Sequence, residues 1–541
     1  MKKLNLLLAA CVVSFMSFAQ LSPYVGLDPT EYAPIGENEM FTLENVWLVS
    51  AAVASPYALD NFGTAGNPNA DPPVPPSPNF ITPATARNMA LRDGIMYFAT
   101  RDVNPVTGIP GLGGLIRVNA ATGERLEPIS FVGTDVFRNE AGAGIGFEFQ
   151  DLKVDCAGNL VVFNMMLSQN SRFQAWVVDT TNPANSHKIV DDIVRDIWLE
   201  NLGEWWYGGY IDDVYVPEGW IAIPDFPIPA VRIDFFGVYG NMLEDGIILG
   251  ANASGLNVLI WNVKGGEATW DPFEGFIGIS PTQPGIRVPV IDGVPTPITN
   301  LGTSPTAIPV GDDIFYLNIN GQPPLFMNIT DGAGIVASSL FYDFPNENDE
   351  LNMGRMQGAA TEIVEFSLRG DYFLLFLHTN HGAAVEGGVE FVLVRFDERG
   401  MFDEMEVMWL FPGIRLGANN GGGAPAAGLS VKVDNGPAGA GEGTATIAIY
   451  SNGNGYGVYI LTSRRYWEPP VSTPEAPRAD ALRLFVEGNV VRMNEPAAEI
   501  TVFSITGQQV ASAVNTNTVT IPVSGVFLVR VDGQTQRVII R

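Results

Sequence analysis

The residue types that most often carry chemistry are scarce in this chain of 541 residues, which holds three histidines. His378 and His381 are separated by two residues and stand where an apolar segment runs into a glycine-containing loop. A zinc site needs at least three protein ligands, and no third ligand can be identified in the sequence. We therefore interpret both as ordinary loop histidines and predict no metal site from them.

Cysteine chemistry is limited to Cys11 and Cys156. Cys11 lies in the N-terminal leader described below, so cleavage of that leader leaves Cys156 without a partner for an internal disulfide. A catalytic thiol needs a nearby base, and no histidine is close to Cys156 in the sequence. We interpret Cys156 as a small structural side chain.

Groups of acids offer the oxygen ligands that calcium prefers, of which it takes roughly six to eight. Such groups occur at Asp191-Asp192, at Asp212-Asp213 and within residues 347–350. None has the turn glycine and distal glutamate of a calcium-binding loop. We interpret them as solvated turns, and calcium is the one cofactor that they would suit.

Consecutive aromatic residues at Trp205, Trp206 and Tyr207 are the best candidates for ligand contact. Aromatic faces bury the apolar faces of sugars, so the three residues would suit a stacking platform; packing in a core is the alternative. The sequence contains no serine-hydrolase, zinc-protease or phosphate-loop motif and no sialidase-type aspartate box. The catalytic residues, if there are any, are therefore unknown, and no other cofactor is predicted.

The elements that position these residues are short strands, because the chain is rich in turn formers, with 59 glycines and 39 prolines. A strand, a Gly- or Asn-containing turn and a second strand recur, at 89–99, 152–163, 307–317 and 366–376 among other places. Such a unit cannot bury both of its faces alone, whereas radial stacking of several units buries them. We predict an all-β fold, with a six- or seven-bladed β-propeller over residues 20–467. A β-sandwich array and a β-helix are the alternatives.

Two assignments inside this region are less regular. The strand at 213–223 is predicted to form a unit with the strand at 258–263. The proline-rich stretches at 67–83 and 281–309 are predicted to be surface insertions, because proline cannot donate to a β-ladder.

The charge balance excludes one class of partner. The chain carries 29 Lys and Arg against 59 Asp and Glu, a formal net charge of −30. Phosphate backbones and anionic lipid would repel it, so nucleic acid is not predicted as a partner.

The first 19 residues have the features of a secretory signal peptide. Lys2 and Lys3 precede a mostly apolar segment at 4–18, and Ala19 ends a small-residue cleavage site. The alternative is a lipoprotein signal with acylation of Cys11, although the apolar run continues past that residue. No later segment reaches about 18 uninterrupted apolar residues, so no transmembrane segment is predicted.

The C-terminal part differs from the rest in composition. Residues 468–480 are rich in proline and are predicted to be an extended linker. From residue 481 onward, five arginines stand against four acids, so the acidity belongs to the first domain. Short, evenly spaced alternating strands over residues 481–541 predict a small β-sandwich.

This tail resembles the type A sorting domain of cargo proteins of the type IX secretion system. The strand at 500–510 contains Gly507 followed by Gln, as in one family element. A second element, Gly-[Val/Ile]-Tyr-[Leu/Ile]-Val-x-Val, is matched by Gly525, Val526 and Val529, with Phe527 in place of the common Tyr. The third is a basic, strand-like ending, which here carries Arg537 and Arg541.

The resemblance covers about a ninth of the chain, and the Tyr-Pro-Asn-Pro opening that is frequent in the family is missing. It implies the type IX secretion machinery as a partner and delivery to the outer-membrane surface or the medium. Removal of the tail and anchoring to lipopolysaccharide are usual in the family. The alternative is an ordinary accessory β-domain.

Three functions suit an exported propeller: a glycan- or protein-binding adhesion module, a hydrolase that uses carboxylates on the propeller face, and a structural surface-layer component. Two carboxylates about 5 to 10 Å apart in a central funnel would favour the hydrolase. A funnel filled by apolar side chains would favour the binding module or the structural component. The binding module is our leading prediction.

Overall fold

The computed structural model describes residues 30–31, 40–50, 86–101, 113–202, 204–211, 214–222, 230–272, 275–279, 290–291, 294–295, 298–302, 304–311, 313–319, 325–328, 338–339, 362–379, 389–396, 406–416, 427–451, 455–469, 484–487, 489–504, 509–523, 525–531 and 534–540. The chain divides into two compact units, Met1–Trp467 and Glu468–Arg541. Regular structure in the described ranges is β-sheet apart from the 3₁₀ helix η1 (Pro183–Asn185) and the helix α2 (Val194–Leu202). Neither these nor any other described segment forms a helix long and apolar enough to cross a membrane.

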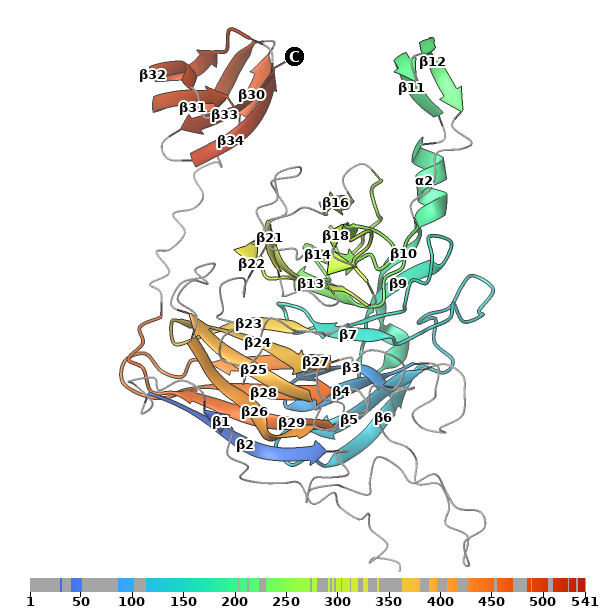
Figure 1. The fold of residues 1–541 in the computed structure, drawn as a ribbon, viewed down its shortest axis with the longest axis vertical. Coiled ribbons are helices and arrows are strands. Elements are labelled where there is room, and N and C mark those ends of the chain that lie inside the picture. The colour runs from blue at the N-terminus through green and yellow to red at the C-terminus, as the bar shows by residue number, and fades with distance from the viewer. Residues whose placement is uncertain are drawn as a thin grey trace, which may run out of the picture. The chain divides into compact units, whose positions relative to one another are not determined.

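Six antiparallel sheets follow one another along the described part of the first unit, and we number them as blades 1 to 6 (Figure 1). Blade 1 contains β3 (Ala86–Arg92), β4 (Ile95–Thr100), β5 (Gly114–Asn119) and β6 (Arg125–Ser130). Blade 2 contains β7 (Asp151–Val154), β8 (Leu160–Phe163), β9 (Arg172–Val177) and β10 (His187–Ile193). Blade 3 contains β13 (Phe236–Gly240), β14 (Gly246–Ala251), β15 (Asn257–Val263) and β16 (Phe276–Gly278).

The remaining three blades complete the series. Blade 4 contains β19 (Thr306–Pro309), β20 (Ile314–Asn318), β21 (Leu325–Asn328) and β22 (Ser338–Ser339). Blade 5 contains β23 (Ile363–Leu368), β24 (Asp371–Thr379), β25 (Val389–Phe396), β26 (Glu406–Leu416) and the short strand β1 (Thr30–Glu31). Blade 6 contains β27 (Ala427–Asp434), β28 (Gly443–Ser451), β29 (Gly455–Ser463) and β2 (Phe41–Ser50).

The N-terminal strands tie the two ends of the propeller chain together. Strand β2 pairs with β29, with Phe41 opposite Ser463, and so forms the outer edge of blade 6. Strand β1 pairs in the same way with β26 of blade 5, with Thr30 opposite Leu410. Both strands lie beside the C-terminal strands of the propeller in Figure 1. An early segment thus completes the last two blades and covers strand edges that would otherwise be open.

The hydrophobic cores show that the ring of blades is closed. Six buried clusters each join one pair of neighbouring blades, and together they join 1 to 2, 2 to 3, 3 to 4, 4 to 5, 5 to 6 and 6 to 1. Because a sheet is buried on both faces only when it has a neighbour on each side, every blade depends on two others. The prediction of an all-β propeller with six or seven blades is confirmed, and six of the described sheets are blades.

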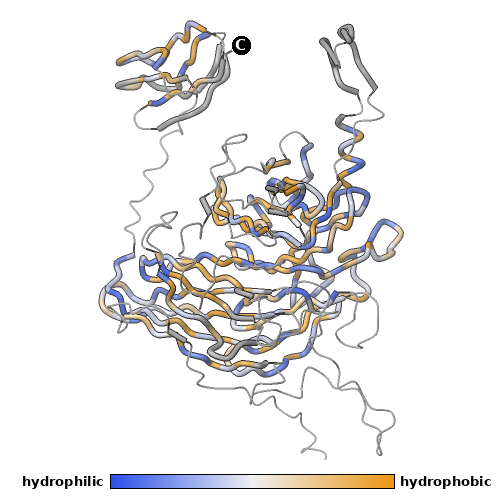
Figure 2. Tube along the Cα trace, viewed as in Figure 1, coloured by the Kyte–Doolittle hydropathy of each residue, from blue (hydrophilic) through white to orange (hydrophobic). Residues whose placement is uncertain are grey.

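Strand sequences follow from this burial. The middle strand β8 reads Leu-Val-Val-Phe and is buried along its whole length, because neighbouring blades cover both of its faces. Apolar residues accordingly run along the blade strands in Figure 2. Asp93 and Gly94 join β3 to β4 with φ of +51° and +73°, and positive φ at both central positions suits the twist of a two-residue hairpin.

One predicted unit is wrong. The strand at 213–223 does not pair with 258–263; it is β12 (Val214–Ala222), which pairs with β11 (Glu204–Ile211) in a separate two-stranded sheet. Residues 258–263 belong to β15, between β14 and β16 of blade 3.

The second proline-rich stretch also needs a correction. Its last residues, Thr306–Pro309, form the innermost strand of blade 4, so they are not a surface insertion. Pro309 is the final residue of β19, opposite Phe315, and a proline is tolerated there because little of the ladder follows. The stretch at 67–83 lies outside the described residues.

The second unit is a small antiparallel β-domain of β30 (Leu484–Glu487), β31 (Val490–Ser504), β32 (Gln509–Thr520), β33 (Gly525–Val531) and β34 (Gln534–Ile540). Strand β31 pairs with β32 along one edge and with β30 and then β33 along the other. Strands β30 and β34, at the two ends of the order, also touch, so the sheet folds over as a small sandwich. Its own core includes Val502, Phe527 and Val529.

Candidate functional site

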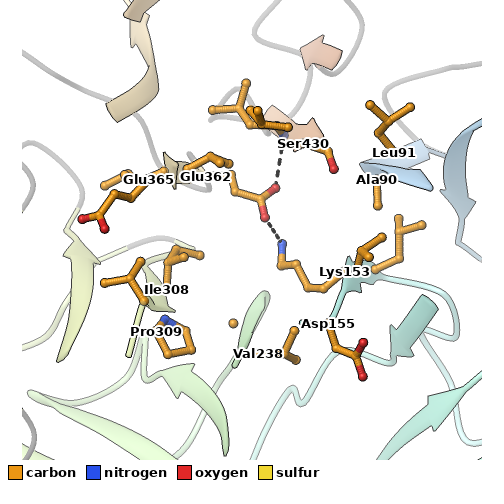
Figure 3. A pocket seen from close by; sticks show the side chains of 18 of the residues that line it. Ala90, Leu91, Lys153, Asp155, Val238, Ile308, Pro309, Glu362, Glu365 and Ser430 are labelled. Carbon is orange, nitrogen blue, oxygen red and sulfur yellow. Dashed lines mark hydrogen bonds and ion pairs between the residues drawn. The ribbon is translucent and has the colours of Figure 1, made fainter. Parts of the chain in front are cut away.

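The centre of the propeller is a channel lined by the innermost strand of every blade, namely β3, β7, β13, β19, β23 and β27. The cavity has a volume of about 260 Å³. Most of the residues that line it are apolar, and they include Met89, Leu91, Val154, Val238, Ile363 and Val431. The polar side chains in this lining are few, and Figure 3 shows how they lie.

The most prominent of them is a buried lysine shared by two carboxylates. Lys153 Nζ lies 2.7 Å from Glu362 Oε1 and 3.2 Å from Asp151 Oδ1. The three residues expose 8%, 6% and 0% of their surface for Lys153, Glu362 and Asp151. Lys153 and Glu362 point toward each other across the channel from blades 2 and 5 (Figure 3). An ion pair therefore bridges two blades that are not neighbours.

The same carboxylates hold backbone and amide donors of other blades. Asp151 Oδ2 accepts a hydrogen bond from Phe236 N of blade 3 at 2.8 Å, and its Oδ1 accepts one from Asn88 Nδ2 of blade 1. Glu362 Oε2 accepts a hydrogen bond from Leu429 N of blade 6 at 3.2 Å. Buried carboxylates are stable only when paired and hydrogen-bonded, and this network meets that condition with groups from five blades.

The pKa values of Lys153 and Glu362 are shifted by burial and by the presence of two acids around one lysine. Burial opposes the charged form of Lys153, but the carboxylates of Asp151 and Glu362 outweigh it and raise the pKa of Lys153 above its ordinary value. Burial raises the pKa of Glu362, and Asp151 adds to this while Lys153 opposes it. Both directions follow from one ammonium group shared by two acids.

The two other acids of the lining are engaged elsewhere. Asp155 accepts hydrogen bonds from Asn159 N at 2.7 Å and from Met242 N at 2.8 Å. Glu365 accepts one from Tyr316 Oη at 2.5 Å. Both turn their carboxylates away from Lys153 in Figure 3. Every carboxylate in the described lining thus has a structural partner, and these residues do not offer a free pair for acid and base catalysis.

Asp151, Lys153 and Glu362 were not among the residues predicted from the sequence to form a site. A signal was present, because the charged residues Asp151 and Lys153 alternate with Leu152 and Val154 in one short strand. A lysine that is buried at the innermost strand of a blade requires a carboxylate beside it. Which acid supplies the charge depends on how the blades close, and local sequence does not contain that information.

The aromatic candidates lie on the inserted hairpin β11–β12. Register places Trp206 opposite Trp220, whereas Trp205 is opposite Ile221 and Tyr207 is opposite Gly219. Among the described strands, β11 and β12 pair only with each other. In the described part of the chain, these residues therefore belong to no blade sheet.

The residues of the tail motif are placed in part. Phe527 and Val529 are buried in the core of the second unit, with 4% and 0% exposure, and Gly525 and Val526 begin the same strand, β33. Arg537 lies in β34, while Gly507 and Arg541 lie outside the described residues.

The remaining candidates for chemistry are not gathered into a site. His187 Nε2 lies 2.9 Å from the carbonyl oxygen of Gly266, and His378 is in β24, whereas His381 lies outside the described ranges. Cys156 is exposed and its Sγ accepts a hydrogen bond from Gly240 N at 3.4 Å. The described residues contain no group of three or more metal-ligating side chains.

The interpretation of Asp191-Asp192 as a solvated turn is wrong, because both residues lie in β10. Asp191 pairs with Arg172 and Lys188. Asp192 is buried and accepts hydrogen bonds from Trp261 Nε1 at 2.9 Å and from Trp270 N at 2.8 Å. Residues 212–213 and 347–350 lie outside the part that the structure describes.

No family model and no curated protein matches the chain. Among solved structures it is similar to a DUF4623 family protein from Bacteroides eggerthii, with 13% identity, a TM-score of 0.44, and coverage of 82% of this chain and 78% of that one. A Trypanosoma rangeli sialidase in complex with sialic acid has 11% identity, a TM-score of 0.35, and coverage of 84% and 69%. The β-propeller domain of the Trilobed protease from Pyrococcus furiosus has 10% identity, a TM-score of 0.28, and coverage of 85% and 96%. At these TM-scores the similarities assign neither an activity nor a site to this chain.

Proposed function

We propose that this protein is an exported, surface-displayed β-propeller that binds a glycan or protein ligand and does not transform it. The observation that carries the proposal is the engagement of every acid in the described channel lining. Asp151 and Glu362 share Lys153, Asp155 holds backbone donors, and Glu365 holds Tyr316. A hydrolase of glycans needs two carboxylates that are free to act on the scissile bond.

Delivery to the surface is proposed from the two ends of the sequence. The signal-peptide features of residues 1–19 support passage across the inner membrane. The tail motif around Gly525 and Arg537 supports recognition by the type IX secretion machinery. The division at Trp467 and Glu468 is consistent with a tail that acts as a module of its own.

Ligand contact is proposed for the hairpin β11–β12. It inserts between blades 2 and 3 and carries Trp205, Trp206, Tyr207 and Trp220 on two paired strands. Because its described residues add no strand to a blade, the aromatic residues are not needed to complete one of the six sheets. Aromatic rings of this kind suit contact with the apolar face of a sugar.

A glycan array probed with the purified full chain is expected to retain it on a limited group of glycans. Trp206→Ala should lower the affinity by about two- to tenfold, since one aromatic contact contributes roughly 0.5–1.5 kcal/mol. Tyr466→Ala is the control, because Tyr466 is 65% exposed and lies outside the hairpin. Absence of retention on both glycan and protein arrays would contradict the binding role, and equal loss in both variants would exclude the hairpin as the contact surface.

A further inference from the structure

A second polar group lies where the innermost strands of blades 1, 2 and 3 begin. It consists of Arg87 in β3, Arg101 directly after β4, Gln150 directly before β7, and Arg232 before β13, and we call it the arginine cluster. None of the four lines the channel cavity described above. The cluster also stands apart from the lysine that joins Asp151 and Glu362.

Strand pairing and side-chain contacts position the members of the cluster. Register pairs Ala86 with Thr100, so Arg87 and Arg101 each follow one member of the same strand pair. Arg101 Nη1 donates to Gln150 Oε1 at 3.2 Å, and its guanidinium lies over the Phe147 ring, 5.4 Å from the centroid. Amide and guanidinium donors from two blades thus meet at the start of their innermost strands.

Two donors of the cluster are buried without an acceptor. Among the described residues, Arg87 Nε and Gln150 Nε2 have no hydrogen-bond partner, and Gln150 as a whole is 0% exposed. Buried polar groups of folded proteins are nearly always hydrogen-bonded, so each exception calls for an explanation. Here both atoms are N–H donors, which means that the missing partner is an acceptor.

The charges around Arg87 point to the same kind of partner. Burial lowers the pKa of Arg87, and the neighbouring Arg101 and Arg232 act in the same direction against Asp234 and Tyr450. Asp234 is already held in a two-point pair by Arg232, at 3.1 and 3.2 Å, and by Ser304. Among the described residues, two further guanidinium groups and one carboxylate therefore act on the charge of Arg87. The side chain of Arg232 is 42% exposed, so the cluster is reached from solvent.

We propose that the arginine cluster binds an oxyanion, which is a carboxylate, sulfate or phosphate group on the ligand. The oxygens would accept hydrogen bonds from Arg87 Nε and Gln150 Nε2, and guanidinium groups are well suited to such anions. This rests on the proposed binding function and narrows the ligand to an acidic glycan or another anionic molecule. The net charge of −30 disfavours anions at long range, but salt screens charges beyond about 8 Å at physiological ionic strength, so the nearby guanidinium groups dominate at the cluster.

Calorimetric titration of the full chain tests the site with four probes: glucuronate, sulfate, phosphate and, as the neutral match, glucose. We expect at least one oxyanion to bind and glucose not to bind. Arg87→Met should weaken oxyanion binding by about tenfold or more, while Arg464→Met leaves it unchanged, because Arg464 is paired with Glu442 on the surface. Preference among the three oxyanions identifies the group that the ligand carries.

A purely structural role for Arg87 is separated by a second readout. If Arg87 serves to bind a ligand, Arg87→Met removes a buried donor that has no acceptor in the ligand-free protein. The melting temperature of the ligand-free protein should then stay equal or rise. The stabilisation by added oxyanion should disappear at the same time. Destabilisation without ligand, oxyanion binding that survives the substitution, or no oxyanion binding by the parent protein overturns the proposal. If the protein bound an oxyanion but was retained by no glycan on the array, the oxyanion site would be supported and the glycan-binding function would be contradicted.

Discussion

Replacement of Lys153 by methionine should destabilise the propeller by about 3–5 kcal/mol, the range found when one partner of a buried ion pair is removed. Asp151 and Glu362 would then lie together in the channel without a cation, while still holding Phe236 N and Leu429 N of neighbouring blades. Urea unfolding followed by tryptophan fluorescence measures the change. All ten tryptophans precede residue 468, so this signal reports the propeller alone.

Two variants serve as controls for this prediction. Lys188→Met removes a pair on the surface, with Asp191, and should cost no more than about 1 kcal/mol. Glu362→Gln keeps an acceptor for Leu429 N and leaves one acid for one lysine, so it should cost far less than Lys153→Met at neutral pH.

Because the pKa of Glu362 is raised in the folded state, its contribution to stability is present at acid pH and is lost as the pH rises through that value. The stability of Glu362→Gln relative to the parent should therefore improve with rising pH. An equal, small effect for Lys153→Met and Lys188→Met would show that the channel pair is not structural.

Deletion of residues 481–541 should abolish surface display while leaving the propeller folded. The two units are separately compact, and the second has a hydrophobic core of its own. If type IX secretion recognises the folded tail, the truncated protein crosses the inner membrane and collects in the periplasm. Fractionation of cells, with protease treatment of intact cells to detect surface protein, measures the distribution. We expect the surface fraction to fall by about an order of magnitude or more.

Point variants in the tail separate recognition of a folded domain from recognition of a short peptide. Val529 is buried in the core of the second unit, whereas Val514 is 67% exposed. Val529→Asp places an unpaired charge in the core and should block display as the deletion does, while Val514→Asp should not. The tail fused to an unrelated periplasmic protein should carry it to the surface. Normal display of the truncated chain would identify the tail as an accessory domain.

Strand-and-turn patterns were sufficient to predict the propeller fold, because most blades contain a pair of strands that can be recognised from local sequence. Pairs such as β3–β4 and β7–β8 combine apolar strands with a tight turn, and their burial on both faces demands neighbours. The pattern failed at β12, where a strand of similar composition pairs within an insertion. Composition alone does not distinguish a blade strand from an inserted hairpin.

Polar contacts between distant blades could not be predicted in the same way. Arg369 is 2% exposed and donates to the carbonyl oxygens of Asn435 at 3.0 Å and Pro437 at 2.8 Å, so it joins blade 5 to a loop of blade 6. Lys153 and the arginine cluster likewise depend on residues from several blades. The partners of these polar side chains lie on other blades and meet them only when the ring closes. No local sequence pattern indicates which residues will meet.

We expect the propeller to bind its ligand without cleaving it. Mass spectrometry of a retained glycan, incubated for a day with a stoichiometric amount of the full chain, is the decisive measurement. The glycan should be recovered intact, at the same yield as in buffer. New reducing ends that disappear in a Glu365→Gln variant would contradict it, because they would show that an acid of the channel, held by Tyr316 in this structure, acts as a catalyst.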